Sequence, residues 1–461
     1  MFATQANANS HGALVIDDVK ILHLAQSEHE TVDHRSILIE NGLITRIAPF
    51  GEIKPPNHAR IVEGKGRLVM AGLVDMHVHV WDRSSLGAYL ASGVTTIRNA
   101  SGMPFHLRLA DQIDKGEIIG PRLITTGPIL NSPGPNAQIN HEMVATAREA
   151  RDAVRRQHAD GFRRIKVYSN LTREAYEAIH EEASRLGMTI MGHTPEGARE
   201  RGMPESIPFN IAFEELLDDG FVTIEHVESI VWHGLRDRHD DAAAKRLASK
   251  ISSANVAVDP TLLAFYNLLK VAETKGDYLK RPGTETLNPL LVAQSQAEYD
   301  RWSQEDVERN RAAFEFYKRM TRFMFDEGVL LVAGSDSGIF TNVPGASLLK
   351  ELDLMHEAGI DPTSVLRTAT INAAAALNEA KTFGRVAEGH RADLLLLDSD
   401  PTKDLAALRS LSAVIANGRL LDRAQLDQLQ SEAAEHNVER TQRNLVEALS
   451  SQGSDVAKLG L

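Results

Sequence analysis

From residue 71 onward, short apolar runs alternate with longer segments that mix apolar and charged positions. The runs have the length of buried strands, and most of the intervening segments have the length of helices. Helices are predicted at residues 143–159, 173–186 and 241–254, for example. Eight runs follow this rhythm: Val74–Val80, Val94–Ile97, Arg122–Thr125, Arg164–Tyr168, Thr189–His193, Val222–His226, Val256–Asp259 and Val329–Ser335. Eight strand-then-helix units predict an α/β fold, a (β/α)8 TIM barrel over residues 71–380.

The connection between the seventh and eighth runs is far longer than the others and forms an insertion over residues 260–327. Its aromatic residues include Phe265, Tyr266, Tyr278, Tyr299 and Trp302. Because segments that follow barrel strands lie over the catalytic face, the insertion predicts a lid or a substrate wall. A helical excursion used for packing or oligomerisation fits the pattern equally well.

The two chain ends carry short strand signals separated by turns. Residues 36–47 alternate around Asn41-Gly42, the typical signature of a β-hairpin. This N-terminal unit is too small to be stable alone, and strand signals return after residue 380. We therefore expect residues 1–70 and 381–423 to form one small β-sandwich domain. Residues 424–461 follow as a charged amphipathic helix and a tail, at the surface or in an interface.

Composition narrows the class of protein. Of 461 residues, 43% are hydrophobic and 25% are charged, which is the balance of a globular protein. The net charge of −13 and the mixing of both signs argue against a nucleic-acid-binding face. No run approaches the length of a membrane helix, and Met1–His11 lacks the features of a secretory signal, so a cytoplasmic location is expected. Cysteine is absent, so any metal must bind histidine or oxygen ligands.

The first run ends in His77-Val78-His79. Side chains two positions apart in a strand share a face, so His77 and His79 lie side by side. Two neighbouring imidazoles at a strand end form half of a metal site. A bare His-x-His also fits an ordinary buried strand with two hydrogen-bonded histidines, so the motif needs support from other strands.

Polar side chains close four other runs. Lys166 shares the inward face with Tyr168, and a buried lysine is costly unless it is neutral or paired. A neutral amine can take up carbon dioxide to form a carbamate that bridges two metals, whereas an ion pair is the structural alternative. His193 and His226 end successive runs, and their matching positions favour metal binding over two unrelated core histidines. The buried carboxylate of Asp336 should face a cation.

These residues together resemble the amidohydrolase superfamily over nearly the whole chain. Within it, the chain looks most like the binuclear-metal branch of imidazolonepropionase-like proteins, Xaa-Pro dipeptidases and ochratoxinase-like amidases. The segments that carry the resemblance are Gly72–His79, Gly93–Thr96, Ile224–His226, Gly334–Gly338 and Gly389–Asp393.

The resemblance implies two divalent metal ions, with zinc as the expected metal. One is held by His77, His79 and Asp336, the other by His193 and His226, and carboxylated Lys166 bridges them. It also implies a metal-bridging hydroxide that attacks an amide carbonyl, because two cations lower the pKa of a shared water.

Three catalytic roles complete the hypothesis. Asp336 is the general base and then the general acid, Tyr168 is a candidate oxyanion donor, and His141 is a candidate contact for a substrate carboxylate. For Tyr168 and His141 a structural role is an equal alternative. The expected reaction is hydrolysis of an amide bond in a small N-acyl amino acid or dipeptide by a homo-oligomer. The alternatives are hydrolysis of a cyclic amide or imide, and a catalytically inactive barrel used for assembly.

Overall fold

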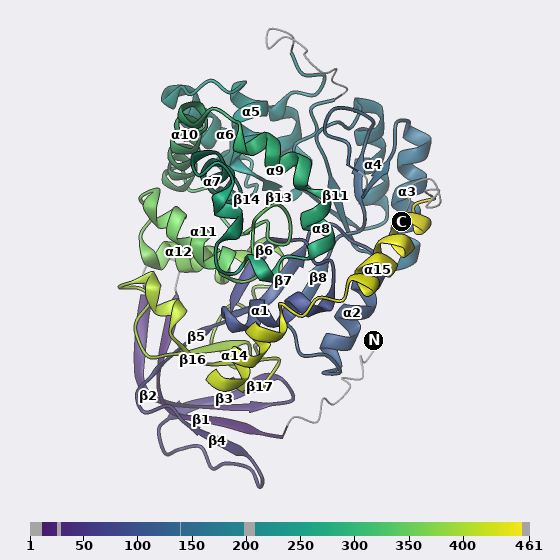
Figure 1. Cartoon of the computed structure of the whole chain (residues 1–461). Helices are drawn as coiled ribbons and strands as arrows, with labels where there is room; N and C mark the ends of the chain where they lie inside the picture. The colour runs from purple at the N-terminus through teal and green to yellow at the C-terminus, as the bar shows by residue number, and fades with distance from the viewer. Residues whose placement is uncertain (1–11, 25–28, 139, 198–207, 454–461) are drawn as a thin grey trace.

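The computed structural model describes residues 12–24, 29–138, 140–197 and 208–453. The predictions for Met1–His11 and for the end of the C-terminal tail lie outside these described residues. Figure 1 shows a region of parallel strands and helices at one end of the molecule and a strand-rich region at the other.

The parallel strands form two sheets. A three-stranded sheet contains β6 (Leu73–Val78), β7 (Val94–Asn99) and β8 (Arg122–Thr125). A six-stranded sheet has the order β10-β9-β11-β12-β13-β14, with β9 (Ile129–Asn131), β10 (His141–Met143), β11 (Arg164–Val167), β12 (Thr189–Gly192), β13 (Phe221–Glu225) and β14 (Val258–Asp259). Helices follow most of these strands, which gives a TIM-barrel-like α/β fold. Seven predicted runs contain the expected strands, whereas β9 and β10 were not predicted.

The eighth predicted run, residues 329–335, forms no regular strand. It makes one parallel bridge, from Leu331 to Val258, and Ser337 just beyond it bridges to Val78. The backbone of Gly334 is pressed between two other elements, because an added Cβ atom would lie 2.0 Å from the Asp259 carboxylate. The segment therefore connects both parallel sheets by isolated bridges, and the described strands do not pair as one closed barrel.

The helices begin and end where the sequence supplies caps. α3 (Ala147–Asp160) begins after Thr146, whose hydroxyl accepts from the backbone of Glu149, and is followed by Gly161 with a φ of 110°. It starts later than predicted because residues 141–143 belong to β10. The helices of this region are α1 (Leu86–Ala91), α2 (Pro104–Asp114), α3 (Ala147–Asp160), α4 (Arg173–Arg185), α5 (Val227–Leu235), α6 (Asp241–Ser253), α11 (Ala346–Glu357), α12 (Pro362–Thr368) and α13 (Ile371–Ala376).

The insertion is helical. It contains α7 (Leu262–Glu273), α8 (Pro289–Gln294), α9 (Gln296–Ser303) and α10 (Val307–Asp326). α7 packs against both α9 and α10, and α10 also packs against α5 and α6. The insertion is thus built onto the helices that surround the parallel strands.

Both chain ends contribute to one eight-stranded mixed sheet, as expected for a shared β unit. The strand order is β17-β16-β15-β5-β1-β2-β3, and β4 pairs with β1. The predicted hairpin is present, and its turn residues Asn41 and Gly42 both have positive φ. The strands pair as a single sheet, so a two-sheet sandwich and its exact domain boundaries stay predictions. The bounds are β1 (Leu14–Leu24), β2 (His29–Glu40), β3 (Leu43–Pro49), β4 (Arg60–Glu63), β5 (Leu68–Ala71), β15 (Leu394–Leu397), β16 (Leu411–Ala416) and β17 (Arg419–Asp422).

The C-terminal segment forms two helices, α14 (Arg423–Glu432) and α15 (Val438–Ser451), where the sequence predicted one. The side chain of Asn437 accepts a hydrogen bond from the backbone of Arg440 and so begins the second helix. α14 lies so close to α1 that a Cβ atom on Gly87 would lie 2.5 Å from the carbonyl of Leu429. The C-terminal segment is therefore packed onto the parallel region (Figure 1).

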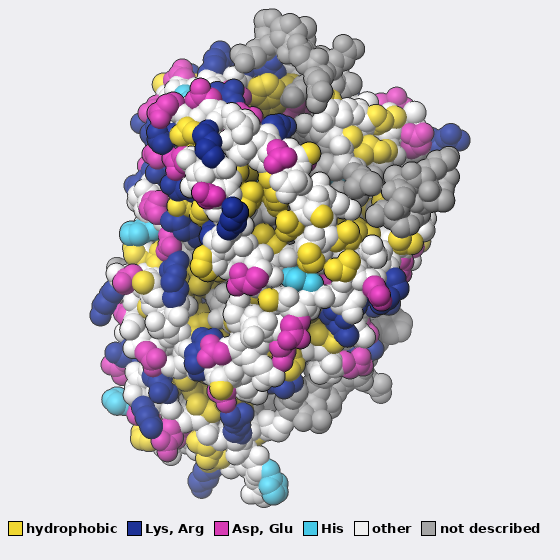
Figure 2. Space-filling view, viewed as in Figure 1, with side chains coloured by type: hydrophobic (Ala, Val, Ile, Leu, Met, Phe, Trp, Pro, Cys, Tyr) yellow, Lys and Arg dark blue, Asp and Glu magenta, His cyan; other side chains and the backbone are white. Residues whose placement is uncertain are grey.

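Positive and negative side chains are intermixed over the face shown in Figure 2. Within the described part of the chain, no helix is both long enough and apolar enough to cross a bilayer.

Candidate metal centre

The structure brings all six predicted ligands to one place at the ends of the parallel strands. His77 belongs to β6 and Lys166 to β11. Of the other four residues, three directly follow strands, and Asp336 directly follows residues 329–335, the segment that bridges the two parallel sheets. The Nζ atom of Lys166 lies 3.3 Å from Nε2 of His77. Neighbouring imidazole ring centroids lie 5.4 Å apart for His77 and His79, 4.8 Å for His77 and His226, and 4.3 Å for His193 and His226.

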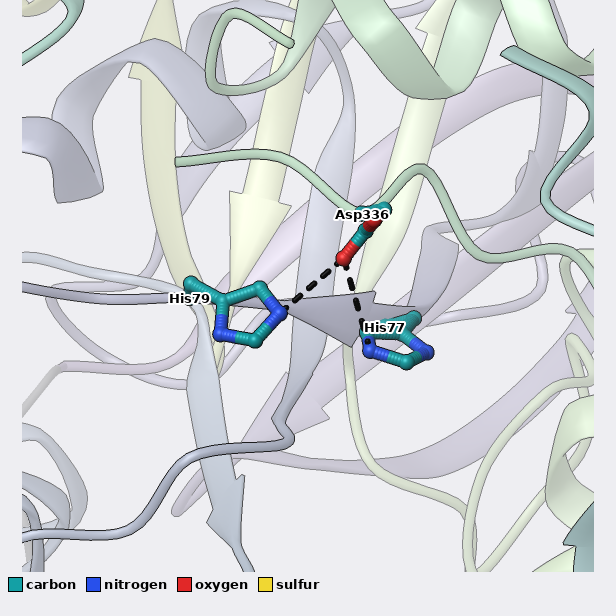
Figure 3. A group of neighbouring side chains, drawn as sticks. All are labelled: His77, His79 and Asp336. Atoms are coloured by element: carbon teal, nitrogen blue, oxygen red, sulfur yellow. Dashed lines mark hydrogen bonds and ion pairs between the residues drawn. The ribbon is translucent and has the colours of Figure 1, made fainter. Parts of the chain in front are cut away.

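Asp336 places its carboxylate between two imidazoles (Figure 3). Its Oδ1 atom lies 3.0 Å from Nε2 of His79 and 3.5 Å from Nε2 of His77. Burial by itself raises the pKa of Asp336, but the bond to His79 and the nearby histidines outweigh it and hold this pKa well below its usual range. The φ of 53° turns the backbone away from the bridging segment at this residue. The carboxylate is therefore a preformed anion at the strand ends.

A buried acid holds the other nitrogen of His77. Glu225 Oε2 lies 2.6 Å from Nδ1 of His77, and Arg98 donates from Nη2 to Glu225 Oε1 at 2.9 Å. All three side chains are almost fully buried. The Nδ1 atom of His77 is thus occupied, which leaves Nε2 as the candidate ligand atom on the side of Asp336 and Lys166.

Two further imidazoles are oriented in the same way. His79 Nδ1 lies 2.9 Å from Ser101 Oγ, and His226 Nδ1 lies 2.6 Å from Thr261 Oγ1. Both His226 and Thr261 have positive φ, an uncommon conformation for side chains of this size. The backbone is therefore held in a costly geometry where these two residues meet.

The protonation states suit metal binding. Burial lowers the pKa of His77 to about 4 and that of His226 to about 3, so both imidazoles are neutral near pH 7. Burial also lowers the pKa of Lys166 to about 8, although the carboxylates of Glu225 and Asp336 oppose this shift. An amine with this pKa is neutral in about a tenth of the molecules at pH 7 and in about half of them near pH 8.

The second ligand pair lies beside the two candidate substrate contacts. His193 is half-buried, and its Nδ1 atom has no hydrogen-bond partner among the described residues. Its ring centroid lies 3.9 Å from that of Tyr168, which in turn lies 4.6 Å from that of His141. Burial raises the pKa of Tyr168 above its ordinary value, so the phenol remains a hydrogen-bond donor. The structure thus places both predicted contacts next to the cluster.

The arrangement fits divalent cations. Within the described ranges, two groups of three side chains place donor atoms within 4.8 Å of one another: His77, His79 and Asp336, and His77, Glu225 and Asp259. Neutral imidazoles, an ionised carboxylate and a buried nitrogen without a partner are the donors that Zn²⁺ and similar ions use.

Sequence reasoning missed the residues that support the ligands. Thr223 and Glu225 lie two positions apart in β13, so their side chains point to the same side of the strand. The available signal was the charge of Glu225 inside a largely apolar run. Asp259 is fully buried, its carboxylate oxygens have no hydrogen-bond partner in the structure as described, and burial raises its pKa well above the usual value. The sequence alone had suggested no role for Glu225 or for Asp259.

The insertion reaches the centre directly. The ring of Phe265 from α7 lies edge-on to His226 at 6.4 Å between centroids, and Tyr317 from α10 lies 5.3 Å from Phe265. Asn342 donates to the carbonyl of Asp336 at 3.0 Å and accepts from Asn267 of α7 at 2.7 Å. The insertion therefore forms an aromatic wall at the centre and contacts the loop that carries Asp336.

The fold and the centre together define a TIM-barrel-like α/β protein with a histidine and carboxylate cluster at the ends of its parallel strands. Residues 68–421 match the model of the amidohydrolase family, and the chain belongs to that family.

Individual relatives agree with this assignment. The chain is 23% identical over 399 residues to an imidazolonepropionase from Treponema denticola, covering 79% of this chain and 85% of the relative. A bottromycin amidohydrolase structure has a TM-score of 0.72 at 24% identity and covers 93% of this chain and 92% of its own. A Xaa-Pro dipeptidase with bound methionine has a TM-score of 0.66 at 20% identity, covering 89% and 100%. The ochratoxinase of A. niger has a TM-score of 0.62 at 17% identity, covering 89% and 95%.

The family match confirms the expected superfamily, and the similar structures include a Xaa-Pro dipeptidase and an ochratoxinase, two of the kinds of relative that the sequence suggested. The structures share the fold with this chain at identities below 25%, so their substrates do not transfer by likeness alone.

Proposed function

We propose that this protein is a binuclear metal-dependent hydrolase that cleaves the amide bond of a small N-acyl amino acid or dipeptide. The observation that carries the proposal is the convergence of His77, His79, Lys166, His193, His226 and Asp336 at one edge of the parallel strands. Membership of the amidohydrolase family supports hydrolysis of an amide.

The donor positions divide into two sets. One set is His77, His79 and Asp336, and the other is His193 and His226. Lys166, whose Nζ lies 3.3 Å from Nε2 of His77, would serve both sets as a carbamate. A carbamate suits this position because a buried, charged ammonium would repel a cation at the same point. When bound, two divalent ions would supply an acidic water as nucleophile and a Lewis acid for the substrate carbonyl, and zinc is the metal we expect.

The remaining chemistry belongs to side chains of this chain. Asp336 accepts the proton of the attacking water and returns it to the leaving nitrogen, because its carboxylate is ionised. The phenol of Tyr168 donates to the carbonyl oxygen as charge develops there. The wall formed by Phe265 and Tyr317 excludes water from this side of the site.

A second substrate class is supported by one specific similarity. The imidazolonepropionase from Treponema denticola is covered over 85% of its length, which favours a cyclic amide or imide as the alternative substrate. Parallel assays with N-acyl amino acids, dipeptides, hydantoins and related ring amides distinguish the two classes, because each predicts turnover in a different half of the panel.

The experiment that tests the proposal combines metal content with one substitution. We expect the purified protein to bind about two metal ions per chain and to lose its amidase activity with Lys166→Ala. Short carboxylic acids should restore part of that activity, because they replace the carbamate. Lys403→Ala is the control, since this lysine is 83% exposed and far from any predicted ligand in sequence. Full activity of the Lys166→Ala protein without added acid would refute the carbamate.

A further inference from the structure

His141 has one ring nitrogen in a hydrogen bond and one without a partner. It belongs to β10 and is only 4% exposed. Its Nδ1 atom lies 3.2 Å from Nδ2 of Asn131, which is the last residue of the neighbouring strand β9. Its Nε2 atom is buried and has no hydrogen-bond partner among the residues described. A buried ring nitrogen of this kind, beside Tyr168, is placed to meet a ligand.

Two backbone groups fix the orientation of the Asn131 side-chain amide. The backbone nitrogen of Asn170 donates to Asn131 Oδ1 at 3.1 Å. At the other end, Nδ2 of Asn131 lies 3.4 Å from the carbonyl oxygen of Asn136. Because a backbone N–H can only donate and a carbonyl can only accept, neither contact permits the amide to be flipped. The Nδ2 atom of Asn131 is therefore the donor to His141 Nδ1.

This polarity determines where His141 carries its proton. A neutral imidazole that accepts a hydrogen bond at Nδ1 must carry its proton on Nε2. Burial lowers the pKa of His141 to about 3, so the ring is neutral at any pH where the protein is expected to act. His141 consequently presents a neutral N–H donor beside the aromatic ring of Tyr168.

We propose that Asn131 is a positioning residue that fixes His141 as a hydrogen-bond donor, so that this end of the site accepts only substrates with an acceptor oxygen there. The carboxylate of an acyl amino acid or dipeptide is the class of group that this donor selects. The inference rests on the proposed function for its substrate, whereas the tautomer of His141 is a property of the protein alone. A substrate with an ammonium or another donor at this position is rejected, because two donors would face each other in a buried place.

The test uses Asn131→Asp, which preserves the size of the side chain and the acceptor for the Asn170 backbone. The aspartate presents an acceptor to His141 Nδ1 in place of a donor, so a proton must occupy Nδ1. ¹⁵N NMR of histidine-labelled protein, with His141 assigned through His141→Gln, should show a neutral ring protonated at Nε2 in the wild type. That signature should disappear in Asn131→Asp. A wild-type ring protonated at Nδ1, or an unchanged ring in Asn131→Asp, would overturn the inference.

Kinetics supply the second readout. In the wild type, the ratio of KM for a carboxylate substrate to KM for its carboxamide should be flat between pH 6 and 9, because a neutral donor does not titrate there. In Asn131→Asp this ratio should change by about tenfold over the same range. An imidazole paired with a carboxylate gains a proton within this range, and a hydrogen bond from the charged ring to the substrate carboxylate is stronger by about this factor than one from the neutral ring.

Asn136→Asp is the matched control, because it adds the same charge five residues further along the chain while its side chain contacts Ser169 and not His141. A flat ratio in Asn131→Asp, or the same pH dependence in Asn136→Asp, would contradict the inference. If Asn131→Asp does not fold, a wild-type ring protonated at Nδ1 would still overturn the inference. Absence of amidase activity with the expected tautomer would refute the proposed function and leave the role of Asn131 intact.

Discussion

Glu225 and His77 form a buried acid–imidazole pair, with Glu225 Oε2 lying 2.6 Å from His77 Nδ1. Burial raises the pKa of Glu225, but Arg98 and His77 outweigh it and hold this pKa well below its usual range. The ionised acid accepts from Nδ1, so the lone pair of His77 is directed from Nε2 toward Asp336 and Lys166. Arg98 in turn donates to Glu225, to Thr223 and to the carbonyl of Met76.

The first prediction concerns this pair. Glu225→Gln should weaken metal binding or activity by about 10- to 100-fold, because the outer partner of a ligating histidine fixes its orientation and basicity. It should also lower the free energy of unfolding by about 3 kcal/mol, since Arg98 is left buried beside a neutral group. Competition titration with a chelating dye and urea denaturation measure the two effects. Glu439→Gln, at an 88% exposed position, is the control. Unchanged metal affinity in Glu225→Gln would show that the pair does not orient the ligand.

The second prediction concerns pH and His106. This fully buried ring binds the carbonyl of Val80 through Nε2 at 2.6 Å and accepts from the backbone of Met103 at 2.9 Å. Burial lowers its pKa to about 3, so between pH 6.5 and 3 the unfolded chain binds a proton that the folded chain does not. Stability contributed by the neutral ring is therefore complete above pH 6.5 and is lost as the pH falls, by at most about 1.4 kcal/mol per unit.

The measurement compares urea midpoints of the metal-loaded protein between pH 7 and 5 for the wild type and His106→Gln. The substituted protein should be less stable at pH 7 and should lose less stability on acidification. If the urea midpoint falls with pH equally steeply in both proteins, His106 is not held neutral.

The convergence of the six predicted ligands could be foreseen from the sequence because each is a polar residue at the end of an apolar run. His193 and His226, for example, follow β12 and β13 directly. The eighth strand could not be predicted correctly, because its irregular path depends on Gly334 passing between Asp259 and His77. Such a constraint involves residues that are distant in sequence. The same is true of Glu225, whose role appears only when β13 lies beside β6 and Arg98.

The pattern of apolar positions in the C-terminal segment also gave no sign of the break between α14 and α15. It follows from Asn437, which caps α15, and from contacts to distant residues. The carbonyl of Trp81 accepts from Asn444, and the hydroxyl of Thr441 accepts from Asn288 of the insertion, both contacts involving the second helix. Tertiary packing decided where this helix begins.

The third prediction tests that packing through Arg440 and Asp82. Arg440 of α15 forms a two-point ion pair with Asp82, which is 2% exposed and lies three residues after His79. Arg440→Ala should lower the free energy of unfolding by about 2 to 3 kcal/mol, because it leaves a buried carboxylate without its cation. Arg443→Ala removes an arginine that is 68% exposed from the same helix and should change stability by less than about 0.5 kcal/mol. Equal midpoints for the two variants in thermal or urea denaturation would contradict the role of the pair.

The fourth prediction concerns the insertion and the loop after Asp336. The Asn342 side chain is fully buried, donates to the carbonyl of Asp336 at 3.0 Å and accepts from Asn267 at 2.7 Å. Asn267 also accepts from Tyr278 at 2.9 Å, so three side chains connect the insertion to Asp336, the proposed general base. Asn342→Asp keeps the acceptor for Asn267 but sets an oxygen against the carbonyl of Asp336.

We expect this substitution to displace Asp336 and to lower kcat by about tenfold or more, with a smaller change in KM. Proton transfer depends steeply on the position of the base, whereas the groups that bind the rest of the substrate are unchanged. Asn378→Asp makes the same chemical change at an exposed position and should leave kcat unaltered. Steady-state kinetics together with metal analysis separate a displaced base from a lost metal. A tenfold rise in KM at constant kcat would mean that Asn342 shapes the substrate pocket and does not position Asp336.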